Sequence, residues 1–81
     1  MKNLNKRWVE LRELRGTENS EMSYIRLQDI ERVFFVENSP HEITIFVSAL
    51  GEKFIYIVVE TMQEAISSSK SLVEEIENSK T

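Results

Sequence analysis

Hydrophobic and polar residues alternate along most of the first sixty positions, and this period of two is typical of half-buried β-strands. The alternation predicts five strands, over residues 7–14, 23–27, 32–37, 41–48 and 53–60. Pro40 and Gly51 mark the turns on either side of the fourth strand, so the last two strands should form a hairpin around Gly51. Between the second and third strands, Ile30 should plug the edge of the core from a turn over residues 28–31.

From Thr61 onwards the apolar positions recur every three to four residues, as they do in an amphipathic helix. Thr61 and Glu64 have the spacing of a capping box, in which each side chain satisfies the other residue's free backbone amide. The apolar or small residues of the expected buried face are Met62, Ala65, Ile66, Ser69, Leu72, Val73 and Ile76. The serine run over residues 67–71, interrupted by Lys70, lowers the helix propensity, so packing against the sheet should hold this helix.

These elements predict an α+β fold: an antiparallel sheet of about four to five strands with one C-terminal amphipathic helix packed on one face. At 81 residues the chain should be a single small domain, residues 1–81, with frayed ends at residues 1–6 and 78–81.

The fifth strand is apolar on both faces, because six consecutive apolar residues occupy positions 54–59. When the alternation is carried across the sheet, one face is aliphatic and contains Val9, Leu11, Ile25, Leu27, Val33, Phe35, Ile43, Ile45, Val47, Ile55, Ile57 and Val59. The opposite face collects Trp8, Tyr24, Phe34, Val36, Phe46, Phe54, Tyr56 and Val58, with Thr44 and Ser48 between them. The helix can cover the aliphatic face, which leaves the aromatic face without a covering element.

Large exposed apolar patches are rare on soluble monomers and mark interaction sites, and interface cores are rich in aromatic residues. The eight residues of the aromatic face are therefore predicted to pack on a second copy, as a homodimer, or on a partner protein. An alternative stays open, in which the N-terminal strand curls round and closes the sheet into a small barrel with a second internal core.

The net charge of −4 is unevenly distributed, because three lysines face eight glutamates from Glu37 to the end of the chain. Direct nucleic-acid binding requires concentrated Lys and Arg, so this half favours a basic protein partner instead. The expected acidic partner-binding surface is Glu60, Glu64, Glu74, Glu75 and Glu77. An acidic surface that serves only solubility is the other interpretation. A stacking platform for single strands around Lys6, Arg7, Trp8 and Arg12 is disfavoured by the interleaved Glu10 and Glu13.

No motif for catalysis, metal binding or a cofactor is found. His41 is the single histidine, there is no cysteine, and the glycines at 16 and 51 form no phosphate-binding loop. The carboxylates of Glu74, Glu75 and Glu77 should diverge around the helix axis as a solvated face. No apolar run approaches the ~20 residues of a membrane span. The chain is therefore expected to be a cytoplasmic protein that is not an enzyme, holds no cofactor and does not enter a membrane.

The order of features over residues 30–66 resembles the small flagellar FlbD and swarming-motility family. The matching positions are Ile30 and Glu31, Pro40, Gly51, residues 59–61 and residues 64–66. This resemblance implies a sheet-plus-helix fold and a role in motility. The chain also looks like small acidic host-modulating proteins of phages.

Two functions follow. The first is a noncatalytic, homodimeric binding protein whose acidic half docks a basic partner and, in its sharper form, mimics DNA to inhibit a DNA-binding protein. The alternative is a structural or accessory factor, of the motility or phage-assembly type, that binds a partner through the aromatic sheet face.

Overall fold

The structure is a computed structural model that describes residues 8–13 and 22–80. Its elements are β1 (Trp8–Glu13), β2 (Met22–Arg26), the 3-10 turn η1 (Leu27–Asp29), β3 (Ile30–Ser39), β4 (Glu42–Ala49), β5 (Glu52–Val59) and α2 (Met62–Ser79). The strands form one antiparallel sheet in the order β2-β1-β5-β4-β3, with α2 packed against it. The α+β prediction is therefore confirmed. The predicted frayed residues 1–6 lie outside the described part of the chain, whereas α2 continues past Glu77 to Ser79.

Two local signals in the sequence produce the expected local structures. Thr61 and Glu64 form the capping box: the Glu64 amide donates to Thr61 Oγ1 at 3.1 Å, and the Thr61 amide donates to Glu64 Oε1 at 3.3 Å. The β4–β5 hairpin turns through Leu50 and Gly51, which both have positive φ, 55° and 80°. Two successive positive φ values are characteristic of the type I′ turn that joins tightly paired strands.

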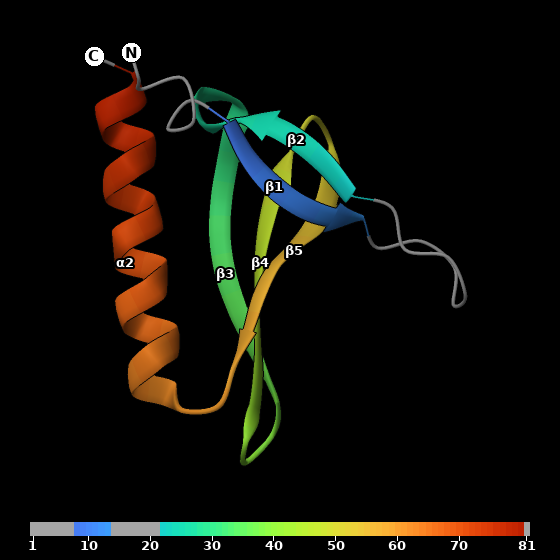
Figure 1. Cartoon of the computed structure of the whole chain (residues 1–81), viewed down its shortest axis with the longest axis vertical. Coiled ribbons are helices and arrows are strands. Elements are labelled where there is room, and N and C mark those ends of the chain that lie inside the picture. Colours follow the sequence, from blue (N-terminus) through green and yellow to red (C-terminus); the bar gives the residue numbers. More distant parts are fainter. Residues whose placement is uncertain (1–7, 14–21, 81) are drawn as a thin grey trace.

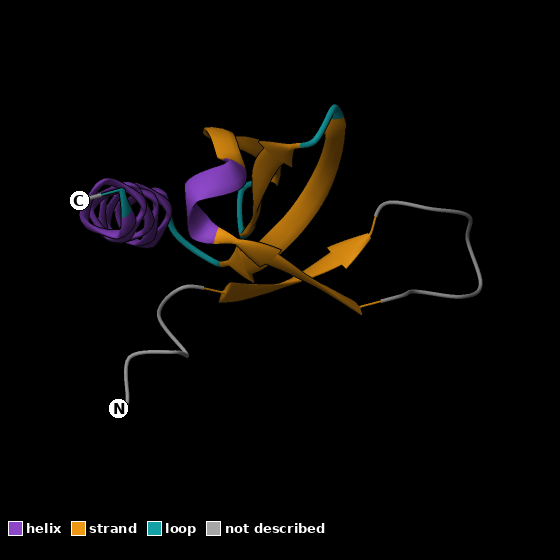
Figure 2. Cartoon of the chain, turned by 90° about the horizontal axis from the view of Figure 1, so that it is seen from above, coloured by secondary structure: helices purple, strands orange, loops and turns teal. Residues whose placement is uncertain are grey.

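β1 and β2 form an arm that crosses in front of the other three strands (Figure 1). β1 is hydrogen-bonded to β5 through only two residue pairs, Arg12 with Ile55 and Glu13 with Phe54. Beyond them the arm curls over the face of β3-β4-β5 that α2 also contacts (Figure 2). We call this face the inner face and the opposite one the outer face.

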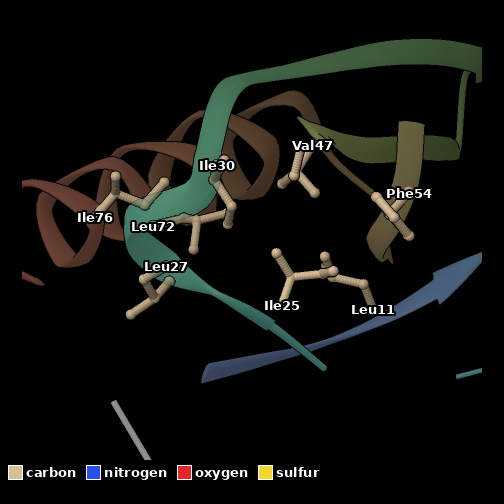
Figure 3. Close-up of a cluster of buried hydrophobic side chains, with 9 residues drawn as sticks. Leu11, Ile25, Leu27, Ile30, Val47, Phe54, Leu72 and Ile76 are labelled. Carbon is tan, nitrogen blue, oxygen red and sulfur yellow. The ribbon is translucent and has the colours of Figure 1, made fainter. Parts of the chain in front are cut away.

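The core lies between the arm, the inner face and α2, as Figure 3 shows. Leu11 and Ile25 of the arm point toward Val47 and Phe54, and η1 and α2 close one end. The buried cluster is Leu11, Ile25, Leu27, Ile30, Val47, Ala49, Phe54, Leu72 and Ile76. The expectation that the helix alone covers the aliphatic face is therefore wrong, because the arm shares it. Ile30 is buried as predicted, with 3% of its surface exposed.

The arm does not make the closed barrel with a second core. β2 and β3 are the two ends of the strand order, so the described strands form an open sheet. The arm also curls over the inner face and adds to the existing core, because Leu11 and Ile25 belong to the same cluster as Leu72. The outer face of β3-β4-β5 gains no cover from it.

A β-bulge in β5 reverses part of the predicted face assignment. Ile57 pairs with Ile45, but the next residue of β4, Phe46, pairs with Ile55, so Tyr56 is an extra residue. One extra residue moves every side chain on its N-terminal side to the other face. Phe54 is therefore opposite Val47 in the core and only 4% exposed, while Ile55 shares the outer face with Phe46.

The predictions for Phe54, Tyr56 and Ile55 are thus wrong. Phe54 is a core residue, and Tyr56 packs against the core cluster from a half-buried position. Ile55 was expected in the aliphatic face and lies on the outer one.

Candidate interaction surfaces

The outer face of β3-β4-β5 carries a continuous apolar patch that no described element covers. Phe34 and Phe46 are cross-strand partners whose rings stack with a centroid distance of 5.2 Å and an interplanar angle of 17°. Both are half-buried, whereas Val36 is 43% and Val58 55% exposed. We define the outer patch as Phe34, Val36, Phe46, Ile55 and Val58.

Thr44 lies between Val36 and Val58 in the central strand, and it is buried. Its hydroxyl accepts a hydrogen bond of 2.7 Å from Asn38 Nδ2, which satisfies the one buried polar side chain of the patch. The patch can therefore lose its water without leaving this hydroxyl unpaired.

Two cations border the outer patch. The Arg32 guanidinium carbon lies 4.5 Å from the centroid of the Phe34 ring, and Lys53 Nζ lies 6.0 Å from it. Both residues are opposite Ser48 in the register, so they form the next row of the same face. Cations over a ring face are attracted by its quadrupole. Neither cation was predicted at this surface, although Arg32 has the same strand parity as Phe34.

Trp8 and Tyr24 were predicted to join the aromatic face and instead lie on the outer side of the arm. Trp8 is 44% exposed, with the Arg26 guanidinium carbon 5.1 Å from its ring. The Tyr24 hydroxyl donates to Glu10 Oε2 at 3.1 Å, and this hydrogen bond raises the pKa of Tyr24. The eight predicted interface residues are therefore divided between the outer patch, the arm and the core.

The five predicted acidic residues are all exposed. The four that belong to α2 point in different directions around its axis. Glu64 and Glu75 are about three helical turns apart and so lie on one side, while Glu74 and Glu77 point elsewhere around the axis. Burial, with a smaller contribution from the Glu75 carboxylate, raises the pKa of Tyr56 above its usual value. Glu64 Oε1 also accepts from the Glu60 amide at 3.2 Å.

A shallow groove of about 420 Å³ runs between the end of β5 and the first turns of α2. It is lined by Val59, Thr61, Gln63, Glu64, Ser67 and Ser68. None of these residues is a cation, and the serines of the run noted in the sequence form part of its helical wall.

His41 is exposed in the turn between β3 and β4. In the described residues, no group of three or more His, Cys, Asp or Glu side chains is placed to hold a metal ion. Within the same residues, no helix has the length and apolar character needed to cross a membrane.

Comparison with family models, curated proteins and solved structures gives no match for this chain. Any function must therefore be argued from its surfaces.

Proposed function

We propose that this chain is a noncatalytic protein-binding protein, homodimeric through its outer patch, whose acidic side docks a basic partner. The outer patch carries the proposal: Phe34 and Phe46 stack on a face that neither α2 nor the arm covers among the described residues. Contiguous exposed apolar surface of this kind marks an interaction site on a soluble protein.

A second copy suits this patch for two reasons. A twofold axis places the same surface on itself, so two Phe34–Phe46 pairs can pack together. A domain of this size also buries only about 60% of the surface of its unfolded chain, and association adds to that burial. The dimer leaves both copies of α2, with Glu64, Glu74 and Glu75, facing away from the contact.

The molecular mass in solution tests the dimer. We expect twice the chain mass of 9.5 kDa by sedimentation equilibrium, and dissociation to monomers in Phe46→Glu and in the milder Val36→Glu. Gln28→Glu adds the same charge on an exposed residue of η1 and should leave the mass unchanged. A monomeric wild-type chain at millimolar concentration, or folded Phe46→Glu dimers, would overturn this proposal.

The docking of a basic partner is tested separately. The more specific hypothesis is that the acidic helices mimic DNA and that the partner is a DNA-binding protein. A purified basic DNA-binding protein should be captured at low salt, released at high salt and displaced by competing duplex DNA. Capture that duplex DNA leaves unchanged would discard the mimic.

The cations beside the patch favour a second candidate, an accessory factor of the motility or phage-assembly type that docks a different protein on the outer patch. Arg32 and Lys53 would approach their own copies across a twofold contact, whereas an acidic rim on a hydrophobic partner would pair with them. In that case Phe46→Glu abolishes partner binding while the mass in solution stays that of the monomer.

A further inference from the structure

β5 has an open edge. β1 leaves β5 after the pair of Arg12 with Ile55, so from Tyr56 to Val59 no described strand lies on that side. An open strand edge presents unpaired backbone N–H and C=O groups that can accept another strand. Ile57 and Val58 are 38% and 55% exposed there, and residues 54–59 contain no charged side chain. Soluble proteins usually protect such an edge with lysine, proline or a covering loop.

The first turns of α2 lie beside the end of this edge, at Val59. Val59 at the end of β5 lines the groove together with Glu64 and Ser68 of α2. Further along the helix, the charge of Glu75 adds to the effect of burial in raising the pKa of Tyr56. A strand added to β5 would therefore direct every second side chain toward α2 and the others toward Val58 on the outer face.

We propose that the open edge of β5, residues 56–59, binds an extended basic segment of the partner as an added β-strand. Lysine or arginine side chains of the segment would enter the groove toward Glu64, with Glu75 further along the same side of α2, and apolar side chains would pack beside Val58. Main-chain hydrogen bonds supply affinity in this mode and the alternating side chains supply specificity. The inference deepens the proposed function, on which it rests for the basic character of the partner, but it does not require the dimer.

The test uses an eight-residue peptide of alternating lysine and valine, with blocked ends, titrated into the isotope-labelled full chain. We expect saturable shifts of the amide signals of residues 56–59 and of the groove side of α2. The same peptide methylated at every backbone amide nitrogen keeps its charge but cannot donate hydrogen bonds from either edge, so it should bind at least tenfold more weakly. A glutamate–valine peptide should not bind.

Paired variants separate the groove from the general acidity of the helix. Glu64→Gln with Glu75→Gln removes the groove carboxylate and the second carboxylate on the same side of α2, and the glutamine at 64 can still serve the capping box. Glu74→Gln with Glu77→Gln removes the same charge from other sides of α2. The first pair should weaken binding at least threefold more than the second.

Three results would overturn the inference: no binding of the basic peptide, equal binding of its methylated form, or equal losses in the two double variants. A further result would overturn the inference: amides 56–59 already protected from exchange in a dimer that the peptide dissociates. The occupant of the β5 edge would then be a second copy of the chain. The mass of the same samples keeps the two proposals apart. Lost peptide binding in an intact dimer refutes only the groove, and a monomer that binds the peptide refutes only the dimer.

Discussion

Phe54→Ala tests the bulge at Tyr56, because the bulge decides which side of β5 belongs to the core. Phe54 is 4% exposed and packs with Leu11 and Val47. Truncation of a buried phenylalanine costs about 3–5 kcal/mol, out of roughly 4–12 kcal/mol expected for a chain of this length. At about 5 °C per kcal/mol, the melting temperature should fall by roughly 15–25 °C.

Ile55→Ala is the matched control, because Ile55 is half-buried on the outer face, next to Phe46 in the register. We expect it to cost about 1–2 kcal/mol, since only part of its surface leaves water on folding. Thermal unfolding followed by circular dichroism, with dilute protein so that self-association contributes little, measures both variants. If Phe54→Ala is too unstable to study, Phe54→Leu should still cost about 1–2 kcal/mol.

The order of the two losses is the decisive result. A strand without the bulge would place Ile55 inside and Phe54 outside, so Ile55→Ala would then be the more damaging change. A loss for Ile55→Ala equal to or larger than that for Phe54→Ala would refute the register and the definition of the outer patch with it.

Three further predictions concern single sites. Leu50→Asn should raise the free energy of unfolding, measured by chemical denaturation, by about 1 kcal/mol, because Leu50 is 67% exposed at a φ of 55° that asparagine tolerates better. Gly51→Ala should lower the free energy of unfolding in the same assay, because the φ of Gly51 is 80°. Ser69→Ala should raise the free energy of unfolding by about 1 kcal/mol in the same assay, because the Ser69 hydroxyl is buried without a hydrogen-bond partner. The control Ser67→Ala, at an exposed position of α2, should raise it by only about 0.5 kcal/mol through helix propensity. Burial, with a smaller contribution from Glu75, raises the pKa of Tyr56 above 10.0, so the folded state holds this proton more tightly than the unfolded state does. The free energy of unfolding should therefore decline as the pH rises above about 10. Tyr56→Phe should reduce this alkaline loss, and an unchanged pH profile would contradict the buried position of the Tyr56 hydroxyl.

Much of the fold could be predicted because its signals are local. The spacing of Thr61 and Glu64 acts within one helical turn, and Gly51 fixes a two-residue hairpin between strands whose own alternation is clear. The buried position of Ile30 followed from the same reasoning.

The surface could not be predicted to the same extent, since it depends on events that leave no local signal. Positions 54–59 are all apolar, so the extra residue at Tyr56 does not disturb any visible alternation, yet it exchanges Phe54 and Ile55 between faces. The arm's path over the inner face depends on where β1 leaves β5, which is a property of twist and packing. The open edge of β5 follows from that departure and was not foreseen.

The positions of the cations make ionic strength a control with opposite effects on the two proposed contacts. Arg12, Arg32 and Lys53 lie on the outer side of the sheet, as Arg26 does on the arm. Glu64 lies in the groove beside Val59, and Glu75 is on the same side of α2. A dimer through the outer patch places two sets of these cations at one interface, and added electrolyte reduces the repulsion between them. The same electrolyte screens the attraction between the groove and a basic segment. Low ionic strength therefore favours the monomer bound to its basic partner, and high ionic strength favours the dimer that has released the partner.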